Sequence, residues 1–288
     1  MSLQNLSPNF LSQVADDVQR ALAEDVGSGD LTASLIDPAR MATATIICRE
    51  NAVICGQPWV NEILRRVVPT AQVTWHYSDG QRCQPGDKIV QAHGPARELL
   101  TAERVCLNFL QTLSAVATKT ATYVDVVKGT NAAILDTRKT IPGLRIAEKY
   151  AVRCGGGKNH RMGLYDAILI KENHIAAAGG ITHALKAAQK IGEKASFIQV
   201  EVETLKQLQE ALDAGAKMIL LDNMTMDMLG EAVRITAGRA SLEISGSVTM
   251  DMLRAYAETG VDRISVGALI KDVKAVDFSM RFQDKPVE

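Results

Sequence analysis

The chain has 288 residues, of which 47% are hydrophobic and 23% are charged, and its formal net charge is −1. This length fits one large or two modest domains, and the near-neutral charge excludes a general nucleic-acid-binding surface. No apolar run approaches the ~20 residues that span a bilayer, and the N-terminus lacks the basic start and apolar core of a secretory signal. The five cysteines show no C-x-x-C spacing. We therefore expect a cytoplasmic globular protein with reduced thiols and no membrane or nucleic-acid partner.

The first hundred residues predict a small domain in which strands and helices do not alternate regularly. Apolar residues at helical spacing predict a helix over residues 10–22, and a glycine-containing turn over 24–32 lacks the P-loop pattern. The further elements expected are a strand or hairpin at 43–55, a helix at 58–68, and strands at 72–77 and 88–92. Such a pattern is typical of an α+β domain.

A long helix is predicted over residues 97–128. One face is apolar, and Arg104, Asn108 and Gln111 form a polar stripe opposite it. Spacing alone favours a stripe that faces water.

After residue 131 the pattern changes to short strands that alternate with helices. The expected strands are 133–135, 167–170, 197–203, 218–221, 242–245 and 263–266. Repeated βα units predict a parallel sheet, but the segment is too short for a complete eight-stranded barrel of ~250 residues. We therefore expect an incomplete α/β barrel with its active site at the carboxyl ends of the strands. The tail at 276–282 is expected to return to the first domain's sheet.

The segment 136–174 carries a strong local positive charge. It contains eight Lys or Arg and four Asp or Glu, so it is +4 while the rest of the chain is −5. Two strand ends and a glycine-rich loop would bring Arg138, Lys139, His160, Arg161 and Lys171 into one volume. Arginine forks match carboxylate and phosphate oxygens, so the expected ligand carries several negative charges.

Other cations of this segment have a simpler interpretation. Arg145, Lys149 and Lys158 occupy helix and loop positions that usually face water, and we expect them to do so.

Acidic residues occupy the predicted strands of the barrel. Glu201 and Glu243 lie within strands and Asp222 follows one. Buried carboxylates are costly unless they are paired, so we expect Lys139, Arg161 and Lys171 to pair with them. A purely structural ion-pair network is the alternative.

Two late turns end strands with small residues before a helix. They are Ser245-Gly246-Ser247 and Ser265-Val266-Gly267-Ala268. Exposed backbone N–H groups at such turns suit a phosphate, although simple helix capping by Ser explains the residues equally well.

Several separated motifs together resemble one enzyme family over nearly the whole chain. They are Asp136-Thr137-Arg138-Lys139-Thr140, Gly155-Gly156-Gly157 with Asn159-His160-Arg161, and Lys171-Glu172-Asn173-His174. The resemblance is to quinolinate phosphoribosyltransferase (decarboxylating), also called nicotinate-nucleotide pyrophosphorylase (carboxylating). It implies a type II phosphoribosyltransferase-like fold, with an N-terminal open-faced α/β sandwich at 1–114 joined by the tail 272–288. The incomplete α/β barrel at 115–271 is then the catalytic domain.

The resemblance also implies an activity. The enzyme is a pentosyltransferase of NAD biosynthesis that joins quinolinate to phosphoribosyl pyrophosphate. The products are nicotinate mononucleotide, CO₂ and pyrophosphate. The implied catalytic residues are Lys139, Lys171, Glu201 and Asp222.

The resemblance assigns binding roles as well. The implied quinolinate ligands are Arg104, Arg138, His160, Arg161 and Lys171. The implied phosphoribosyl pyrophosphate ligands are Lys139, Glu201, Asp222, Ser245, Gly246, Ser247, Ser265 and Gly267. Mg²⁺ is the implied cofactor, held by Glu201 and Asp222 directly or through water. Arg104 would be donated across the interface of a homodimer, which could also assemble into a hexamer. Ser247 departs from the family, which usually has a second glycine there.

Two other functions fit the residues. One is a Schiff-base aldolase with Lys171 as its lysine. The other is a related barrel protein that binds another carboxylated or oxyanion ligand without decarboxylation.

Overall fold

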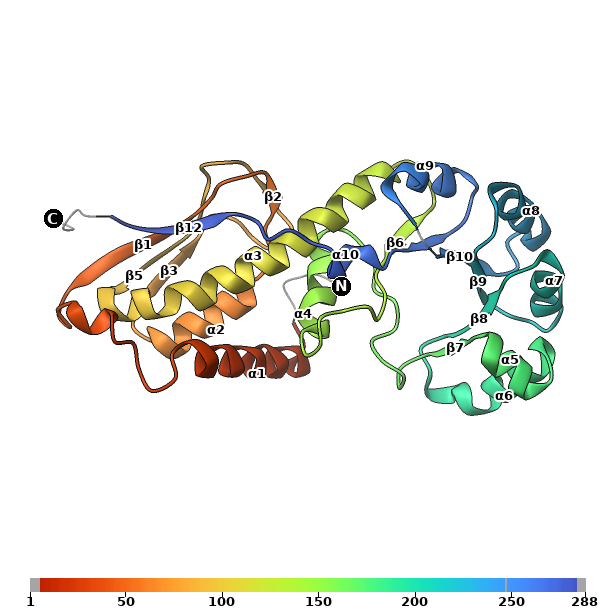
Figure 1. Cartoon of the computed structure of the whole chain (residues 1–288), viewed down its shortest axis with the longest axis horizontal. Helices are drawn as coiled ribbons and strands as arrows, with labels where there is room; N and C mark the ends of the chain where they lie inside the picture. The colour runs from red at the N-terminus through yellow and green to blue at the C-terminus, as the bar shows by residue number, and fades with distance from the viewer. Residues whose placement is uncertain (1–5, 247, 284–288) are drawn as a thin grey trace. The chain divides into compact units, whose positions relative to one another are not determined.

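The computed structural model describes residues 6–246 and 248–283, which fall into two compact units (Figure 1). Unit 1 comprises the described residues of Met1–Ala121, Pro142–Gly156 and Asp272–Glu288, and unit 2 comprises Thr122–Ile141 and Gly157–Lys271. The long helix thus crosses from one unit to the other at residue 121, rather than at the expected boundary of 114. Residues 142–156, expected in the barrel, group with unit 1 because their helix packs against that unit's aromatic core.

Unit 1 contains an antiparallel sheet in the strand order β12-β1-β5-β3. The strands are β1 (Met41–Cys48), β3 (Gln72–Trp75), β5 (Lys88–Pro95) and β12 (Phe278–Gln283), and a separate pair joins β2 (Ala52–Val53) to β4 (Arg82–Cys83). The last strand, β12, pairs with β1 with Cys48 opposite Phe278, which confirms the expected return of the tail.

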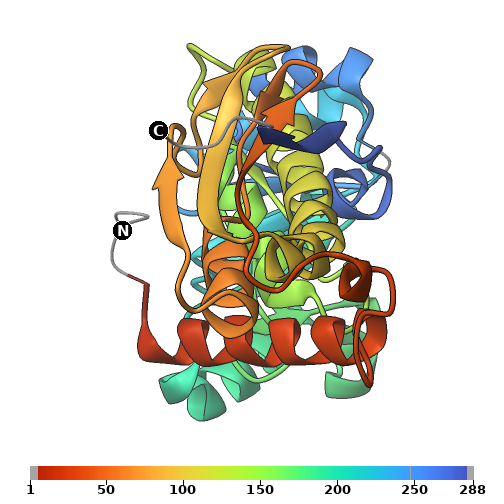
Figure 2. The same cartoon turned by 90° about the vertical axis from the view of Figure 1, so that its left-hand side faces the viewer.

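The helices of unit 1 lie beside this sheet (Figure 2). They are α1 (Pro8–Asp25), α2 (Gln57–Val67), most of α3 (Ala96–Val126) and α4 (Arg145–Cys154). The indole of Trp59 is fully buried among the rings of Phe10, Phe109 and Tyr150, and its Nε1 donates to Asp17 Oδ2 at 3.1 Å. Burial of an aromatic core of this kind is a main source of stability for a small unit.

One expectation about α4 is wrong. Lys149 was expected to face water, but only 1% of it is exposed. The reason is that α4 is buried from Ala147 through Val152, so the helix has no outward face at this point. Lys158, by contrast, is exposed as expected.

Unit 2 is built on a six-stranded parallel sheet in the order β6-β11-β10-β9-β8-β7. The strands are β6 (Ala133–Leu135), β7 (Ile168–Ile170), β8 (Ile198–Val202), β9 (Met218–Asp222), β10 (Ser241–Ser245) and β11 (Arg263–Ser265). Because β6 and β7 stand at the two edges, the sheet is an open barrel, as the βα pattern predicted.

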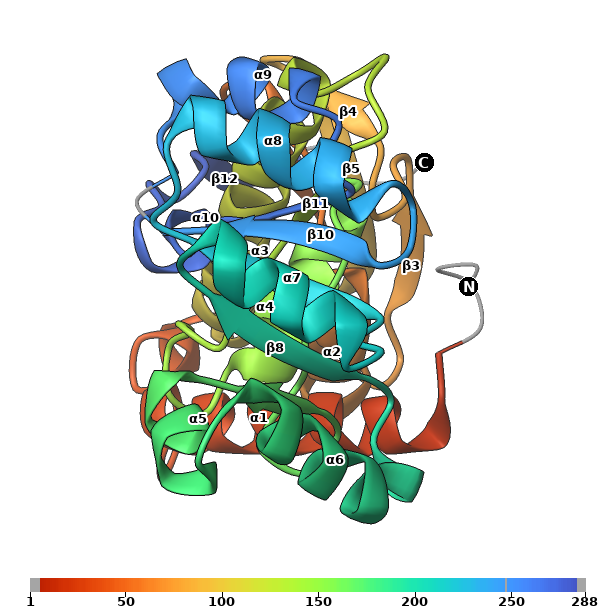
Figure 3. The ribbon, with the colours of Figure 1, turned by 90° about the vertical axis from the view of Figure 1, so that its right-hand side faces the viewer.

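Helices connect successive strands and cover one face of the sheet, as Figure 3 shows for α7 and α8 in front of β8 and β10. They are α5 (Glu172–Ala178), α6 (Ile181–Ile191), α7 (Leu205–Asp213), α8 (Met226–Thr236), α9 (Met250–Glu258) and α10 (Ala268–Lys271). Local chemistry starts two of them: Thr204 and Gln207 form a capping box on α7, and the Thr225 side chain caps α8. Among residues 6–246 and 248–283, no helix combines the length and apolar character needed to cross a membrane.

Candidate active site

A pocket of about 290 Å³ lies within unit 2, at the carboxyl ends of its strands. Its lining residues come from β7, β8, β9, β10, β11 and the loops after β6 and near β7. They are Thr137, Arg138, Lys139, His160, Arg161, Leu169, Lys171, Glu201, Leu220, Glu243, Ser245 and Ser265. Eight of the residues that the sequence singled out for function therefore line one pocket. Parallel strands place their carboxyl ends at one edge, which is why residues far apart in the chain meet here.

Strand register brings Lys171 and Glu201 together. Ile170 of β7 pairs with Val200 of β8, so the next residue on each strand lies beside the other. Lys171 Nζ donates to Glu201 Oε2 at 3.0 Å, and the lysine side chain is half-exposed while that of Glu201 is mostly buried. The expected pairing of this carboxylate with a cation is confirmed.

Arg138 and Arg161 form a second part of the cationic lining. Burial lowers the pKa of the Arg161 guanidinium, and the nearby charge of Arg138 lowers it further, whereas Asp166 acts in the opposite direction. Two guanidinium groups that repel each other in a partly desolvated pocket favour an anion between them.

Lys139 approaches the turn after β11. A Cβ atom on Gly267 would lie 3.0 Å from Lys139 Cδ and 3.5 Å from its Nζ, so the absence of a side chain at Gly267 makes room for the lysine. The ammonium group therefore lies close to one of the two turns that the sequence predicted to bind phosphate.

The loop that carries His160 is anchored to the end of β6. Asp136 is fully buried, and its Oδ1 accepts from the His160 backbone N–H at 2.8 Å while its Oδ2 accepts from Asn159 Nδ2 at 2.5 Å. Asp136, the acid of the Asp136–Thr140 motif, thus positions the loop and is not part of the pocket lining.

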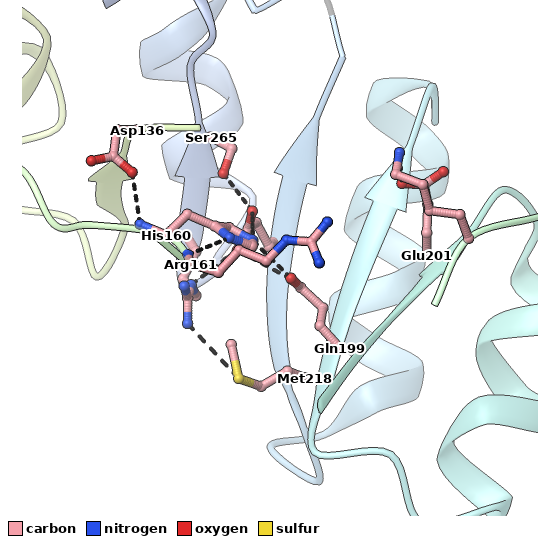
Figure 4. A network of polar contacts seen from close by, with 10 residues as sticks. Asp136, His160, Arg161, Gln199, Glu201, Met218 and Ser265 are labelled. Atoms are coloured by element: carbon pink, nitrogen blue, oxygen red, sulfur yellow. Dashed lines mark hydrogen bonds and ion pairs between the residues drawn. The ribbon is translucent and has the colours of Figure 1, made fainter. Parts of the chain in front are cut away.

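The His160 ring extends a buried polar network (Figure 4). Its Nε2 lies 3.0 Å from Gln199 Oε1, and Gln199 Nε2 donates to Glu243 Oε2 at 3.1 Å. In Figure 4 the side chains of His160, Gln199 and Ser265 converge, whereas Glu201, two residues after Gln199 on β8, stands apart.

Two sequence expectations need correction at this network. Glu243 pairs with Arg263, whose Nε lies 3.0 Å from Glu243 Oε2, rather than with Lys139 or Arg161. Adjacent strands place these two side by side, since Glu243 of β10 is opposite Arg263 of β11. The Ser265 hydroxyl, expected to face a phosphate, instead donates to Glu243 Oε1.

Asp222 and Gly246 lie together next to the pocket. Asp222 ends β9 opposite Ser245 of β10, and its Oδ2 accepts from Asn223 Nδ2 at 3.0 Å. Gly246 has φ +98°, and a Cβ there would lie 2.9 Å from Asn223 Oδ1, so both conformation and space require glycine. Ser247 lies outside the described residues.

Arg104 belongs to unit 1, on the exposed side of α3. It is the one implied quinolinate ligand that does not line the unit 2 pocket.

A larger cavity of about 760 Å³ lies in unit 1. The one cation in its lining is Arg65, which is neutralised by hydrogen bonds to Glu62. Chemistry rather than size therefore assigns the anion site to the pocket of unit 2.

Sequence reasoning expected the wrong partners for Glu243 and gave no role to Gln199 or Arg263. The period-two positions of Gln199 and Glu243 on their strands put them on the inward face, but the pairing of β10 with β11 was needed to reveal Arg263 as a partner.

An open α/β barrel with a cationic, carboxylate-bearing pocket at its strand ends defines an enzyme that acts on small, highly charged anions. The model of the quinolinate phosphoribosyl transferase C-terminal domain matches residues 116–281, and that of the N-terminal domain matches residues 30–114. The chain belongs to the quinolinate phosphoribosyltransferase family, and the aldolase alternative falls with that assignment.

Individual relatives agree with this assignment. The probable nicotinate-nucleotide pyrophosphorylase [carboxylating] of Bacillus subtilis is 43% identical over 257 residues, which cover 89% of each chain. The chloroplastic enzyme of the same name from Oryza sativa subsp. japonica is 40% identical, with 92% of this chain and 76% of the relative covered. The solved nicotinate-nucleotide pyrophosphorylase from Francisella tularensis superposes with a TM-score of 0.92 at 42% identity, covering 98% of this chain and 99% of the other.

Proposed function

We propose that this enzyme transfers the phosphoribosyl group of phosphoribosyl pyrophosphate to quinolinate and releases CO₂ and pyrophosphate, giving nicotinate mononucleotide. The observation that carries the proposal is the joint lining of one pocket by Arg138, Lys139, Arg161 and Lys171, with Glu201 beside them. One small anion does not need four cations. The four positive charges match two ligands bound side by side, a pyridine with two carboxylates and a sugar with several phosphates.

Binding of quinolinate follows from the two arginines. Its carboxylates lie on adjacent ring carbons, and Arg138 and Arg161 present forked donors from two different loops. The repulsion between the two guanidinium groups is relieved when a dianion lies between them. Lys171 adds a third positive charge and is already aligned by Glu201.

Transfer requires stabilisation of a developing cation. As the bond from the ribose C1 atom to pyrophosphate breaks, positive charge grows on the sugar ring. The carboxylates of Glu201 and Asp222 stand at neighbouring strand ends, where fixed negative charge stabilises that ring. Lys139, next to the Gly267 turn, can neutralise the departing pyrophosphate.

Decarboxylation then needs no group from the protein beyond orientation. Bond formation between the ribose carbon and the pyridine nitrogen makes the ring cationic. The ring can accept the electron pair left at C2 when that carboxylate departs as CO₂. A proton then replaces CO₂ at this carbon.

Mg²⁺ is the proposed cofactor, and the donor set supports it, because Glu201 and Asp222 offer the hard oxygen ligands that Mg²⁺ prefers. They would hold it directly or through water. When bound, it shares the negative charge of the pyrophosphate.

We further propose that the enzyme works as a homodimer in which Arg104 completes the site of the partner subunit. The support is the exposure of Arg104 on α3 and the absence of any unit 1 residue from the lining of the described pocket.

The test is direct. The purified protein is incubated with quinolinate, phosphoribosyl pyrophosphate and Mg²⁺, and nicotinate mononucleotide is measured by chromatography and absorbance. Omission of each substrate in turn is the control. Ligand binding without pyrophosphate release would instead support a barrel that binds anions without this reaction.

A further inference from the structure

We propose that Glu243 and Gln199 are positioning residues that hold His160 in a single neutral tautomer and thereby fix the backbone of Arg161. The inference deepens the proposed function, because Arg161 is assigned there to the quinolinate carboxylates. It rests on a chain of contacts: Glu243 to Gln199, Gln199 to His160, and His160 to the backbone of Arg161 (Figure 4). Glu243 also faces the ring directly, since its Oε1 lies 3.6 Å from His160 Nε2, on the side where the ring proton is placed.

The direction of each hydrogen bond follows from its donors. The backbone N–H of Arg161 can only donate, and it lies 2.7 Å from His160 Nδ1, so Nδ1 is the unprotonated nitrogen. The ring proton is then on Nε2, which donates to Gln199 Oε1. If both ring nitrogens carried a proton, the Nδ1–H of His160 would face the backbone N–H of Arg161, and two donors would repel each other.

Glu243 sets the orientation of the Gln199 amide. A carboxylate accepts and does not donate, so the amide must turn its Nε2 toward Glu243 and its Oε1 toward His160. The Ser265 hydroxyl donates to the other carboxylate oxygen, and the Arg263 contact is an ion pair that lacks the alignment of a hydrogen bond. Gln199 and Glu243 are both fully buried, so water does not compete for these groups.

Packing holds the ring in the same place. The Phe197 ring meets the His160 ring edge-on at 5.3 Å, and Arg263 lies over the Phe197 ring at 5.8 Å. The imidazole is therefore restrained at both nitrogens and at its edge.

The consequence falls on Arg161. Its N–H is fixed by His160 Nδ1, and the preceding N–H is fixed by Asp136 Oδ1. If the ring changed tautomer or rotated, the Arg161 backbone would lose its acceptor and the guanidinium would move in the pocket. A displacement of about 1 Å in a binding group costs on the order of 10²-fold in rate.

The first experiment measures the tautomer without any substrate. In protein labelled with ¹⁵N-histidine, the chain's five histidines give separate ring signals, and a His160→Asn variant identifies the pair that belongs to His160. We expect the neutral Nε2–H pattern at neutral pH. An Nδ1–H tautomer or a doubly protonated ring at neutral pH would overturn the inference, whatever the enzyme's activity.

The second experiment breaks the chain of contacts. Gln199→Leu removes both amide hydrogen bonds at similar volume, and Glu243→Gln replaces the acceptor-only carboxylate. We expect the His160 signals to shift, quinolinate binding by calorimetry to weaken about 10-fold or more, and phosphate binding at the Lys139 side to change little. The matched controls are Gln209→Leu and Glu258→Gln, which alter exposed side chains on α7 and α9.

Outcomes separate this inference from the proposed function. Unchanged quinolinate binding in a folded Gln199→Leu variant with shifted His160 signals would overturn the positioning role. Failure of the wild-type enzyme to bind quinolinate would instead overturn the proposed function and leave the tautomer measurement standing. If Gln199→Leu does not fold, the tautomer of His160 in the wild-type enzyme and the quinolinate affinity of the Glu243→Gln variant still test the positioning role.

Discussion

Gly155, the C-cap of α4, packs closely against α3 in unit 1, and an alanine there should destabilise the enzyme. A Cβ at this position would lie 2.4 Å from the Ala117 carbonyl oxygen, 2.6 Å from Thr120 Cβ and 3.1 Å from the Ala121 nitrogen. Two of these three atoms belong to helix backbone, which cannot rotate away. Gly155 has φ −75°, which any residue can adopt, so the whole cost comes from packing.

The expected loss of stability is about 3 kcal/mol, at the upper end of the range for overpacked cores, because the neighbouring backbone must move. For a unit of about 150 residues, each kcal/mol lowers the melting temperature by about 2–4 °C. Gly155→Ala should therefore melt about 6–12 °C below the wild-type enzyme when unfolding is followed by circular dichroism.

Gly230 provides a matched control. It lies exposed within α8, and an added Cβ would meet no atom within 4 Å. Because alanine favours helix over glycine, Gly230→Ala should stabilise by about 0.5–1 kcal/mol. If Gly155→Ala has the melting temperature of the wild-type enzyme, or if both variants change the melting temperature in the same direction, the steric reasoning is wrong.

Four further predictions concern the site and pH. Lys139→Ala should lower turnover by about 10²-fold or more with an unchanged circular dichroism spectrum, whereas Lys206→Ala, an exposed change on α7, should have no effect. Arg104→Ala should raise the KM for quinolinate about 10-fold or more. If Arg104 acts across the dimer, mixed dimers of the Arg104→Ala and Lys139→Ala variants should regain activity, because one of their two sites then has both residues. No recovery of activity would contradict a shared site. Chelation by EDTA should stop product formation, and added Mg²⁺ should restore it. Hydrogen bonding, first from Arg65, lowers the pKa of Glu62 to about 2. Its contribution is therefore present above pH 4.5 and is lost as the pH falls toward 2. The difference in the free energy of unfolding between wild type and Glu62→Gln, measured by urea titration, is about 1 kcal/mol after solvent screening and should shrink between pH 7 and pH 3.

The sequence by itself determined the elements and the chemistry of the strand ends. Short apolar runs predicted β6, β7, β9 and β10 to within a residue, because buried parallel strands carry a strong local signal. The charge excess of segment 136–174 predicted an anion site, and Arg138, Lys139, Arg161 and Lys171 do line one pocket.

Only the tertiary structure decided which groups satisfy one another. No local pattern reveals that Glu243 pairs with Arg263, since that depends on which strands are neighbours and in what register. The Ser265 hydroxyl turns to a buried carboxylate, and Lys149 is buried because α4 is enclosed from Ala147 through Val152. Local sequence specifies backbone conformation and the residues available for chemistry, whereas burial and hydrogen-bond partners arise from long-range packing.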